Sequence, residues 1–318
     1  MGSHKYLQAA ETAIRTFLSP GEDDRCIILC DRSGKSLAEL FYQAFEKLSN
    51  RIVFMQSPLP AIYNGELDGL LKGAFGKTTL AVVILPDIVP ASLPSWLSHR
   101  PGNRILCIHA AMPQTFLRWL KAARPRSIEK TEKLADLLSI GKKMSLKTPQ
   151  GADLTVPLSR RVGIPDARNT QRANFIAFLP SGEVRLQPGL KTVSGMWQVN
   201  FIAGSKSDNR PIDITLKDGR LVKVRGQSPT ANAIRKFFKE HGPEARQILE
   251  ISVGTNDNFS FGRSAIEDRK VRGACTLTFG NPNAITGGHH FETLSLVSTG
   301  ATIAIDGRTI LENGELLI

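Results

Sequence analysis

The chain has 318 residues, 41% of them hydrophobic, which allows a large core that is normally divided between two domains. No apolar run approaches the roughly 20 residues that span a bilayer, so a helical membrane protein is excluded and cytoplasmic residence is expected. The formal net charge of +12 attracts anions, but the basic residues are spread along the chain and seldom alternate with aromatic ones, so we expect an anionic or peptide ligand and no nucleic acid.

The first 125 residues alternate between two kinds of segment. Short apolar runs suited to buried strands occur at residues 25–30, 51–55, 80–85 and 105–109. Amphipathic stretches with helical spacing occur at residues 6–17, 37–48, 62–72 and 115–123. Because this alternation is typical of a parallel sheet with crossover helices, we expect residues 1–125 to form a doubly wound α/β domain.

The sequence changes in character after Pro125. A charged amphipathic helix is predicted at residues 127–140 and a second helix at 230–241. The remaining pattern predicts strands at residues 144–148, 153–156, 193–201, 212–216, 220–224 and 302–305. Asp218-Gly219 and Asp306-Gly307 predict tight hairpin turns. We therefore expect residues 126–318 to form a β-rich α+β domain, and to carry the functional site.

The four cysteines of the chain lie singly inside apolar runs and form no Cys-x-x-Cys pair. This spacing predicts neither a disulfide framework nor a zinc site. We expect buried, reduced thiols, in agreement with a cytoplasmic protein. They are Cys26, Cys30, Cys107 and Cys275.

Two acidic residues of the second domain stand close to glycine in an apolar context. Glu183 follows Pro180-Ser181-Gly182, and Glu250 lies between Leu249 and Ile251 in a predicted buried strand. A carboxylate buried there requires a cation or several hydrogen-bond donors. A metal ion and an arginine side chain both meet that requirement at Glu250, so the sequence leaves both open. Glu183 is the weaker case, because a Pro-x-Gly-Glu turn is also ordinary at a surface.

A third acidic residue ends the segment Gly287-Gly288-His289-His290-Phe291-Glu292. His290 and Glu292 are two residues apart, so on a strand their side chains project from one face. An imidazole and a carboxylate together suit a divalent metal ion, and the glycines allow close approach. The alternative is a polar surface turn.

Six motifs follow one another in a recognisable order: residues 179–184, 250–256, 273–280, 287–288, 290–292 and 305–307. Their order and spacing resemble the leucyl aminopeptidase (aminopeptidase T) metallopeptidases and the related 2,5-dihydroxypyridine 5,6-dioxygenases. The resemblance covers nearly the whole chain and is clearest from Asn174 onward. It implies a homodimer.

The resemblance also implies particular site residues. It places the two glutamates of the family at Glu183 and Glu250, which become the catalytic residues, and its His-x-Asp pair at His290 and Glu292. It places Thr276 where the family has a metal-ligand histidine, and threonine is a poor ligand. Arg269 stands where the family has an acid. We expect a divergent member that lacks one ligand.

A single divalent ion remains consistent with this pattern. Its ligands would be Glu250, His290 and Glu292, together with His289, and the ion would be iron, zinc, manganese or cobalt. Glu183 or Glu250 would accept a proton from bound water.

Three functions fit the sequence. We expect first a divergent aminopeptidase-like metalloenzyme, a metal-dependent hydrolase that acts on a peptide or a peptide-derived small molecule. The second is a mononuclear non-haem iron dioxygenase, or another oxidative or cyclising enzyme of natural-product biosynthesis. The third is a non-catalytic family member that has lost the metal and binds a peptide or a partner.

Overall fold

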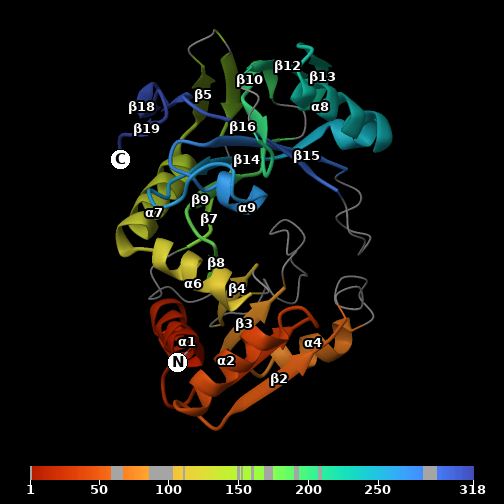
Figure 1. Cartoon of the computed structure of the whole chain (residues 1–318). Helices are drawn as coiled ribbons and strands as arrows, with labels where there is room; N and C mark the ends of the chain where they lie inside the picture. Colours follow the sequence, from red (N-terminus) through yellow and green to blue (C-terminus); the bar gives the residue numbers. More distant parts are fainter. Residues whose placement is uncertain are drawn as a thin grey trace. The chain divides into compact units, whose positions relative to one another are not determined.

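The computed structural model describes residues 2–58, 67–85, 103–109, 112–148, 151, 153–158, 161–167, 175–189, 193–206, 210–281 and 292–318 (Figure 1). Contacts within the chain divide it into two compact units. Unit 1 comprises the described residues of Met1–Arg124 and Asp166–Ser181. Unit 2 comprises those of Pro125–Pro165, Gly182–Ala284 and His290–Ile318. Within the described residues, the chain leaves unit 1 near residue 125 and returns to it at Asp166–Ser181.

Unit 1 contains a five-stranded parallel sheet with the strand order β2-β1-β3-β4-β8, as the alternating pattern predicts. The strands are β1 (Cys26–Cys30), β2 (Ile52–Gln56), β3 (Leu80–Ile84), β4 (Arg104–Ile108) and β8 (Phe175–Leu179). The inner strands β1 and β3 are buried along their whole length, as expected for continuous runs of branched apolar residues in a parallel sheet. Strand β8 was not predicted.

Four helices of unit 1 flank this sheet in the described part of the chain. They are α1 (Gly2–Leu18), α2 (Lys35–Glu46), α4 (Asp68–Phe75) and α6 (Pro113–Ala122). Helix α4 places Leu71 and Phe75 in one hydrophobic cluster with Ile27, Leu29 and Val83 of the sheet. Part of the predicted helix 62–72 lies outside the described residues, and the remainder belongs to α4.

Unit 2 is built on a large sheet of 14 strands, and its described strand pairs are antiparallel. The main strand order is β11-β16-β15-β14-β13-β12-β10-β6-β5-β17-β18-β19, and β9 pairs with β14 and β7. The first seven strands are β5 (Lys143–Lys147), β6 (Asp153–Pro157), β7 (Ile164–Pro165), β9 (Glu183–Leu186), β10 (Ser194–Val199), β11 (Phe201–Ile202) and β12 (Ile212–Lys217). The others are β13 (Arg220–Val224), β14 (Gln247–Gly254), β15 (Cys275–Gly280), β16 (Leu294–Ser298), β17 (Thr302–Ile305), β18 (Arg308–Glu312) and β19 (Glu315–Leu316). The predicted β-rich second domain is confirmed.

The helical segments of unit 2 are α7 (Pro125–Ile140), α8 (Pro229–Glu240), the 3₁₀ turn η2 (Pro243–Arg246) and α9 (Ala265–Asp268). Both predicted hairpin turns are present. Asp218-Gly219 and Asp306-Gly307 have positive φ angles at each residue, 51° and 74° in the first turn and 49° and 86° in the second. This is the conformation that joins antiparallel strands with the right twist.

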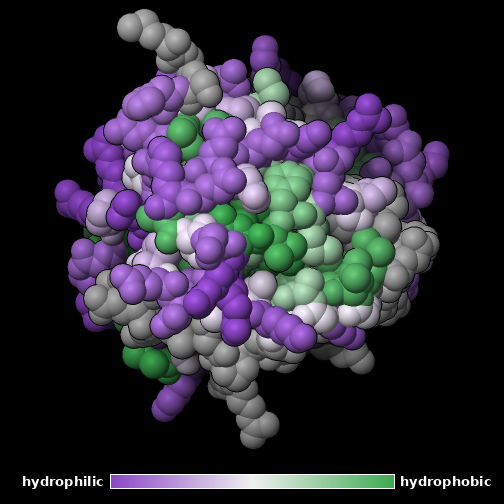
Figure 2. All heavy atoms as spheres, turned by 90° about the horizontal axis from the view of Figure 1, so that it is seen from below, coloured by the Kyte–Doolittle hydropathy of each residue, from purple (hydrophilic) through white to green (hydrophobic). Residues whose placement is uncertain are grey.

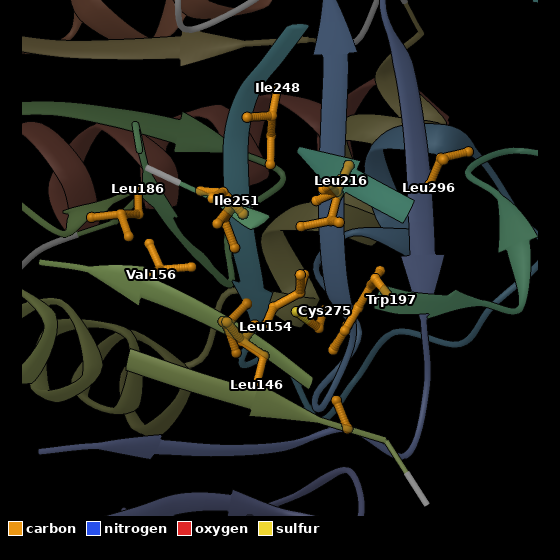
Figure 3. Packing of buried hydrophobic residues seen from close by; sticks show 14 of the residues in the cluster. Leu146, Leu154, Val156, Leu186, Trp197, Leu216, Ile248, Ile251, Cys275 and Leu296 are labelled. Atoms are coloured by element: carbon orange, nitrogen blue, oxygen red, sulfur yellow. The ribbon is translucent and has the colours of Figure 1, made fainter. Parts of the chain in front are cut away.

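The core of unit 2 forms between its strands and α7 and α8. Figure 3 shows Trp197 of β10 packed among aliphatic side chains, and Trp197 is completely buried. All four cysteines are free and buried, as predicted. Among the described residues, no helix is long and apolar enough to cross a bilayer.

Candidate functional site

Strands β9, β14 and β15 have one apolar face and one polar face, because side chains alternate along a strand. The apolar face belongs to the core of unit 2 and carries Val184, Leu186, Ile251, Val253, Cys275 and Leu277. We call the other side the polar face. It carries Glu183, Arg185, Glu250, Ser252, Gly254, Thr276 and Thr278.

The strand register defines how the polar face is laid out. Arg185 of β9 is paired with Ser252 of β14, and Ser252 is paired with Thr276 of β15. These three residues form one row across the sheet, with directly opposed side chains about 5 Å apart at Cβ. Glu183 is paired with Gly254 on one side of this row. Glu250 lies on the other side of Ser252 along β14.

Glu183 is held by two basic side chains that follow α9 in the sequence. Lys270 Nζ donates to Glu183 Oε1 at 2.8 Å, and Arg269 Nε donates to Glu183 Oε2 at 3.3 Å. Glu183 and Lys270 are both buried. The first of the two predicted catalytic glutamates therefore has protein cations as its partners.

Glu250 is also held by two basic side chains. Arg269 Nη2 donates a short hydrogen bond to Glu250 Oε1, and Arg185 Nη1 lies 3.8 Å from Glu250 Oε2. Arg269 thus connects the two glutamates through different nitrogens of one guanidinium. We call these five side chains the charge cluster: Glu183, Arg185, Glu250, Arg269 and Lys270.

A glycine on the polar face allows the backbone that carries Arg269 to approach the sheet. A Cβ atom at Gly254 would lie 2.1 Å from the carbonyl oxygen of Val271. Two hydrogen bonds fix this approach: Asn256 N donates to Lys270 O at 3.0 Å, and Gly273 N donates to Gly254 O at 3.0 Å. The missing side chain at Gly254 therefore positions Arg269 and Lys270 over the polar face.

Helix α9 fixes the start of the same segment. Ser264 caps the helix, and its hydroxyl accepts a hydrogen bond from Glu267 N. The buried Asp268 carboxylate accepts from Gly262 N at 2.7 Å and from Gly204 N at 2.9 Å. Asp268 therefore binds backbone amides and does not take part in the charge cluster.

The electrostatics of the charge cluster favour the ionised form of Glu183. Burial alone would raise the pKa of Glu183, but the positive charges of Arg269 and Lys270 outweigh burial and hold this pKa well below its ordinary value. Burial would lower the pKa of Arg269, but the two glutamates raise it. Two carboxylates and three cationic groups leave the cluster with one net positive charge.

Two hydroxyls in the middle of the polar face have no hydrogen-bond partner among the described residues. They are Ser252 Oγ and Thr276 Oγ1, and both residues are buried. The neighbouring hydroxyl of Thr278 lies 3.0 Å from Ser295 Oγ, so it has a partner. Buried polar atoms without a partner cost free energy, so the pair at Ser252 and Thr276 requires an explanation.

The predicted metal ligands are not brought together by the described residues. Glu292 Oε2 lies 3.0 Å from His241 Nε2 at the end of α8, and 71% of the Glu292 side chain is exposed. His289 and His290 lie outside the described residues. A metal site formed by Glu250, His289, His290 and Glu292 stays a prediction.

The donors around Glu183 and Glu250 do not fit a divalent ion. Each carboxylate already has two cationic partners, and the net positive charge of the cluster opposes another cation. Within the described ranges, no group of three or more His, Cys, Asp or Glu side chains could hold a metal. Thr276, which stands where a histidine was expected, presents only a hydroxyl.

The sequence contained signals for two members of the charge cluster that the prediction missed. Arg185 is two residues after Glu183, so on a strand it shares the face of Glu183. Lys270 follows Arg269 directly. Neither residue was assigned to the site, because a buried acid shows that a cation is needed but does not identify that cation.

Unit 1 offers a different kind of surface. Figure 2 shows hydrophobic side chains gathered on the face seen from below, the side on which β2 and α2 lie in Figure 1. Residues of α2 and β2 line a pocket of about 380 Å³: Glu39, Tyr42, Gln43, Ile52 and Phe54. The carboxylate of Glu39 is exposed and lies 3.8 Å from Lys35 Nζ, and no other titratable side chain of the described residues lines this pocket except Tyr42. The charge cluster of unit 2 is therefore the stronger candidate site.

Comparison with known proteins identifies one matching family and two similar solved structures. Residues 92–318 match the profile of the NicX family, 2,5-dihydroxypyridine 5,6-dioxygenase. Among solved structures, the chain is similar to 2,5-dihydroxypyridine dioxygenase from Pseudomonas putida KT2440, with a TM-score of 0.81 and 17% identity over 100% of this chain and 98% of that chain. It is also similar to AmpT from Thermus thermophilus, with a TM-score of 0.62 and 13% identity over 100% of both chains. No protein of curated function matches the sequence. At these identities the structural likeness shows a shared fold.

Proposed function

Because the chain belongs to the 2,5-dihydroxypyridine 5,6-dioxygenase family, we propose that it is a divergent member that binds a small molecule at the polar face of unit 2 and holds no metal ion at Glu183 and Glu250. The observation that supports this proposal is the position of Arg269, which bonds both carboxylates. Binding, and not metal-assisted chemistry through these two glutamates, is the function that this arrangement favours.

The physical reason is competition for the same oxygen atoms. A divalent ion coordinates carboxylate oxygens at about 2.0–2.6 Å, which requires that those oxygens be released from other partners. Release of Arg269 and Lys270 would leave their charges buried without partners, and an unpaired buried charge costs several kcal/mol. A metal at Glu183 and Glu250 would therefore have to offset a large penalty.

A second function is favoured by the extent of the family match, which includes His289, His290 and Glu292. In this alternative, those residues hold one divalent ion, and the protein is a ring-cleaving dioxygenase or a hydrolase that acts on a peptide-derived molecule. Glu292 would have to leave His241, which is a small cost at an exposed position. Glu250 would join as a ligand only if it left both of its arginines.

Elemental analysis of protein purified without chelators distinguishes the two functions. The first predicts no bound metal after supplementation with iron, zinc, manganese or cobalt salts. The second predicts roughly stoichiometric metal that is lost in His290→Ala but kept in Glu183→Gln. Bound metal that is lost in both Glu183→Gln and Glu250→Gln would contradict the first proposal directly.

We further propose that the protein is a cytoplasmic homodimer. The family resemblance supports the dimer, and the four buried, free cysteines agree with a reducing compartment. Light scattering coupled to size-exclusion chromatography would measure the mass in solution. A single species with the mass of one chain would contradict the dimer.

A further inference from the structure

We propose that the polar face binds the carboxylate of a small organic acid, between the guanidinium of Arg269 and the hydroxyls of Ser252 and Thr276. This inference rests on the proposed function, because the site must be free of a metal ion at Glu183 and Glu250. It adds the chemical class of the ligand, a small organic acid whose planar carboxylate carries one negative charge.

The position of Arg269 over the sheet follows from its two partners. Its Nε bonds Glu183, which is paired with Gly254, and its Nη2 bonds Glu250. Ser252 lies between Gly254 and Glu250 on β14 and shares their face. The guanidinium therefore lies across the row that Ser252 forms with Thr276.

Arg269 also keeps one donor group available. Its Nη1 makes no hydrogen bond with any residue in the described part of the chain, although Nε and Nη2 are both engaged. The side chain is 15% exposed, against 5% or less for Arg185 and Lys270. Arg269 is thus the most accessible cation of the cluster, and it can meet an anion without breaking its existing bonds.

The hydroxyls of Ser252 and Thr276 supply the second half of the site. The two residues are paired across β14 and β15, so their side chains are neighbours on one face. Both hydroxyls are buried and lack a partner among the described residues. A hydroxyl can donate to a carboxylate oxygen, and such a bond to a charged acceptor is stronger than one between neutral groups.

Charge determines which ligand fits. The charge cluster has three cationic groups and two carboxylates, so it favours an added anion, whereas a metal ion or an organic cation would add to its positive charge. A carboxylate has two acceptor oxygens, so one can accept from an arginine while the other accepts from a hydroxyl. An amide of the same shape has only one acceptor oxygen, because its nitrogen is a donor.

The test uses the full chain, freed of metal with a chelator. Acetate and benzoate are the probes, and acetamide and benzamide are their neutral counterparts of nearly the same shape. Isothermal titration calorimetry should show carboxylate binding with a dissociation constant on the order of 1 mM or below and no amide binding. Equal binding of amides and carboxylates, or binding of neither, would overturn the inference.

Variants then locate the binding site. Arg269→Lys keeps the positive charge but removes the guanidinium, and with it the Nη1 donor. Thr276→Val removes one hydroxyl at nearly constant volume. Each should weaken benzoate binding about tenfold, whereas Arg51→Lys in unit 1 should have no effect. Wild-type affinity in both site variants would refute the location. Because elemental analysis reports the metal independently, a failure of this inference is distinguishable from a failure of the proposed function.

Discussion

The role of Arg269 can be tested by Arg269→Met, which removes the charge and keeps an unbranched side chain of similar length. In the wild-type protein this guanidinium is shared by two buried carboxylates. After the substitution, Glu183 and Glu250 remain in the same place with one cationic partner each. The expected result is a marked loss of stability of unit 2.

The magnitude follows from the remaining contacts. Removing one partner of a buried ion pair costs about 3–5 kcal/mol. Glu183 keeps Lys270 at 2.8 Å, which limits its share of the loss. Glu250 keeps only Arg185 at 3.8 Å, which is beyond hydrogen-bond distance. We therefore expect a decrease of about 3 kcal/mol in the free energy of unfolding near neutral pH, to which both carboxylates contribute.

The effect should depend on pH in a particular direction. The pKa of Glu183 is held below its ordinary value, so this residue stabilises the wild-type protein above about pH 4.3, and the stabilisation is lost as pH falls toward the folded-state pKa. In Arg269→Met the pKa of Glu183 rises, so acidification protonates this carboxylate more readily and relieves the buried charge. The difference between variant and wild type should therefore become smaller on acidification.

Urea unfolding of unit 2 can be followed through the fluorescence of Trp197, which is completely buried in that unit. Replacement of Trp96 and Trp119 by Phe in all proteins compared makes this signal specific. Arg51→Met serves as the control, because the Arg51 pair with Asp23 is exposed and should contribute almost nothing. A loss below about 1 kcal/mol, or equal losses near pH 7 and pH 4, would refute the assignment of Arg269 as the cation that holds both glutamates.

Three further outcomes are expected. Gly254→Ala should lower the free energy of unfolding by about 2 kcal/mol, because the new Cβ meets the carbonyl of Val271. Gly73→Ala, at an open position on the surface of a helix, should stabilise the protein slightly. Equal effects of the two substitutions in urea unfolding would contradict the close approach at Gly254. Thr276→Val should leave ligand-free stability unchanged or raise it by about 1 kcal/mol, and a clear loss would show that the hydroxyl has a partner. The cysteines should react slowly with Ellman's reagent in native protein and fully in urea, since burial raises the pKa of Cys30 to about 11; rapid labelling of native protein would contradict this.

The parallel sheet of unit 1 could be predicted because each of its first four strands is a short apolar run between helical segments. Strand β8 has a similar apolar sequence, Phe175–Leu179, but it follows three strands of unit 2 in the chain, β5, β6 and β7. Local pattern does not identify the sheet that a strand joins. Strand β8 belongs to unit 1 because β4 offers a parallel edge there, with Arg104 paired with Phe175.

The site could be predicted in part. Burial of Glu250 was expected, whereas the Pro-Ser-Gly-Glu turn left a surface position open for Glu183, which is in fact buried. The resemblance drew attention to Arg269 and Thr276. The identity of the cation that neutralises each glutamate could not be derived from the sequence, because a metal ion and an arginine can both neutralise a buried carboxylate. That choice depends on whether a basic side chain reaches the oxygen atoms. Here Arg269 and Lys270 reach those atoms because their backbone lies close to β14, which requires glycine at position 254.

Under the proposed function, a change at position 269 explains why the acidic residues of the polar face need no metal. In the pattern that this chain resembles, an acid stands at the position of Arg269. Exchange of a carboxylate for a guanidinium changes the local charge by two positive units, which equals the charge of one divalent ion. Glu183 and Glu250 then remain neutralised from within the protein. Reversal of this exchange by Arg269→Glu should remove the internal cation and allow a divalent ion to bind, which calorimetric titration with manganese would detect; unchanged exclusion of manganese from a folded variant would refute this account.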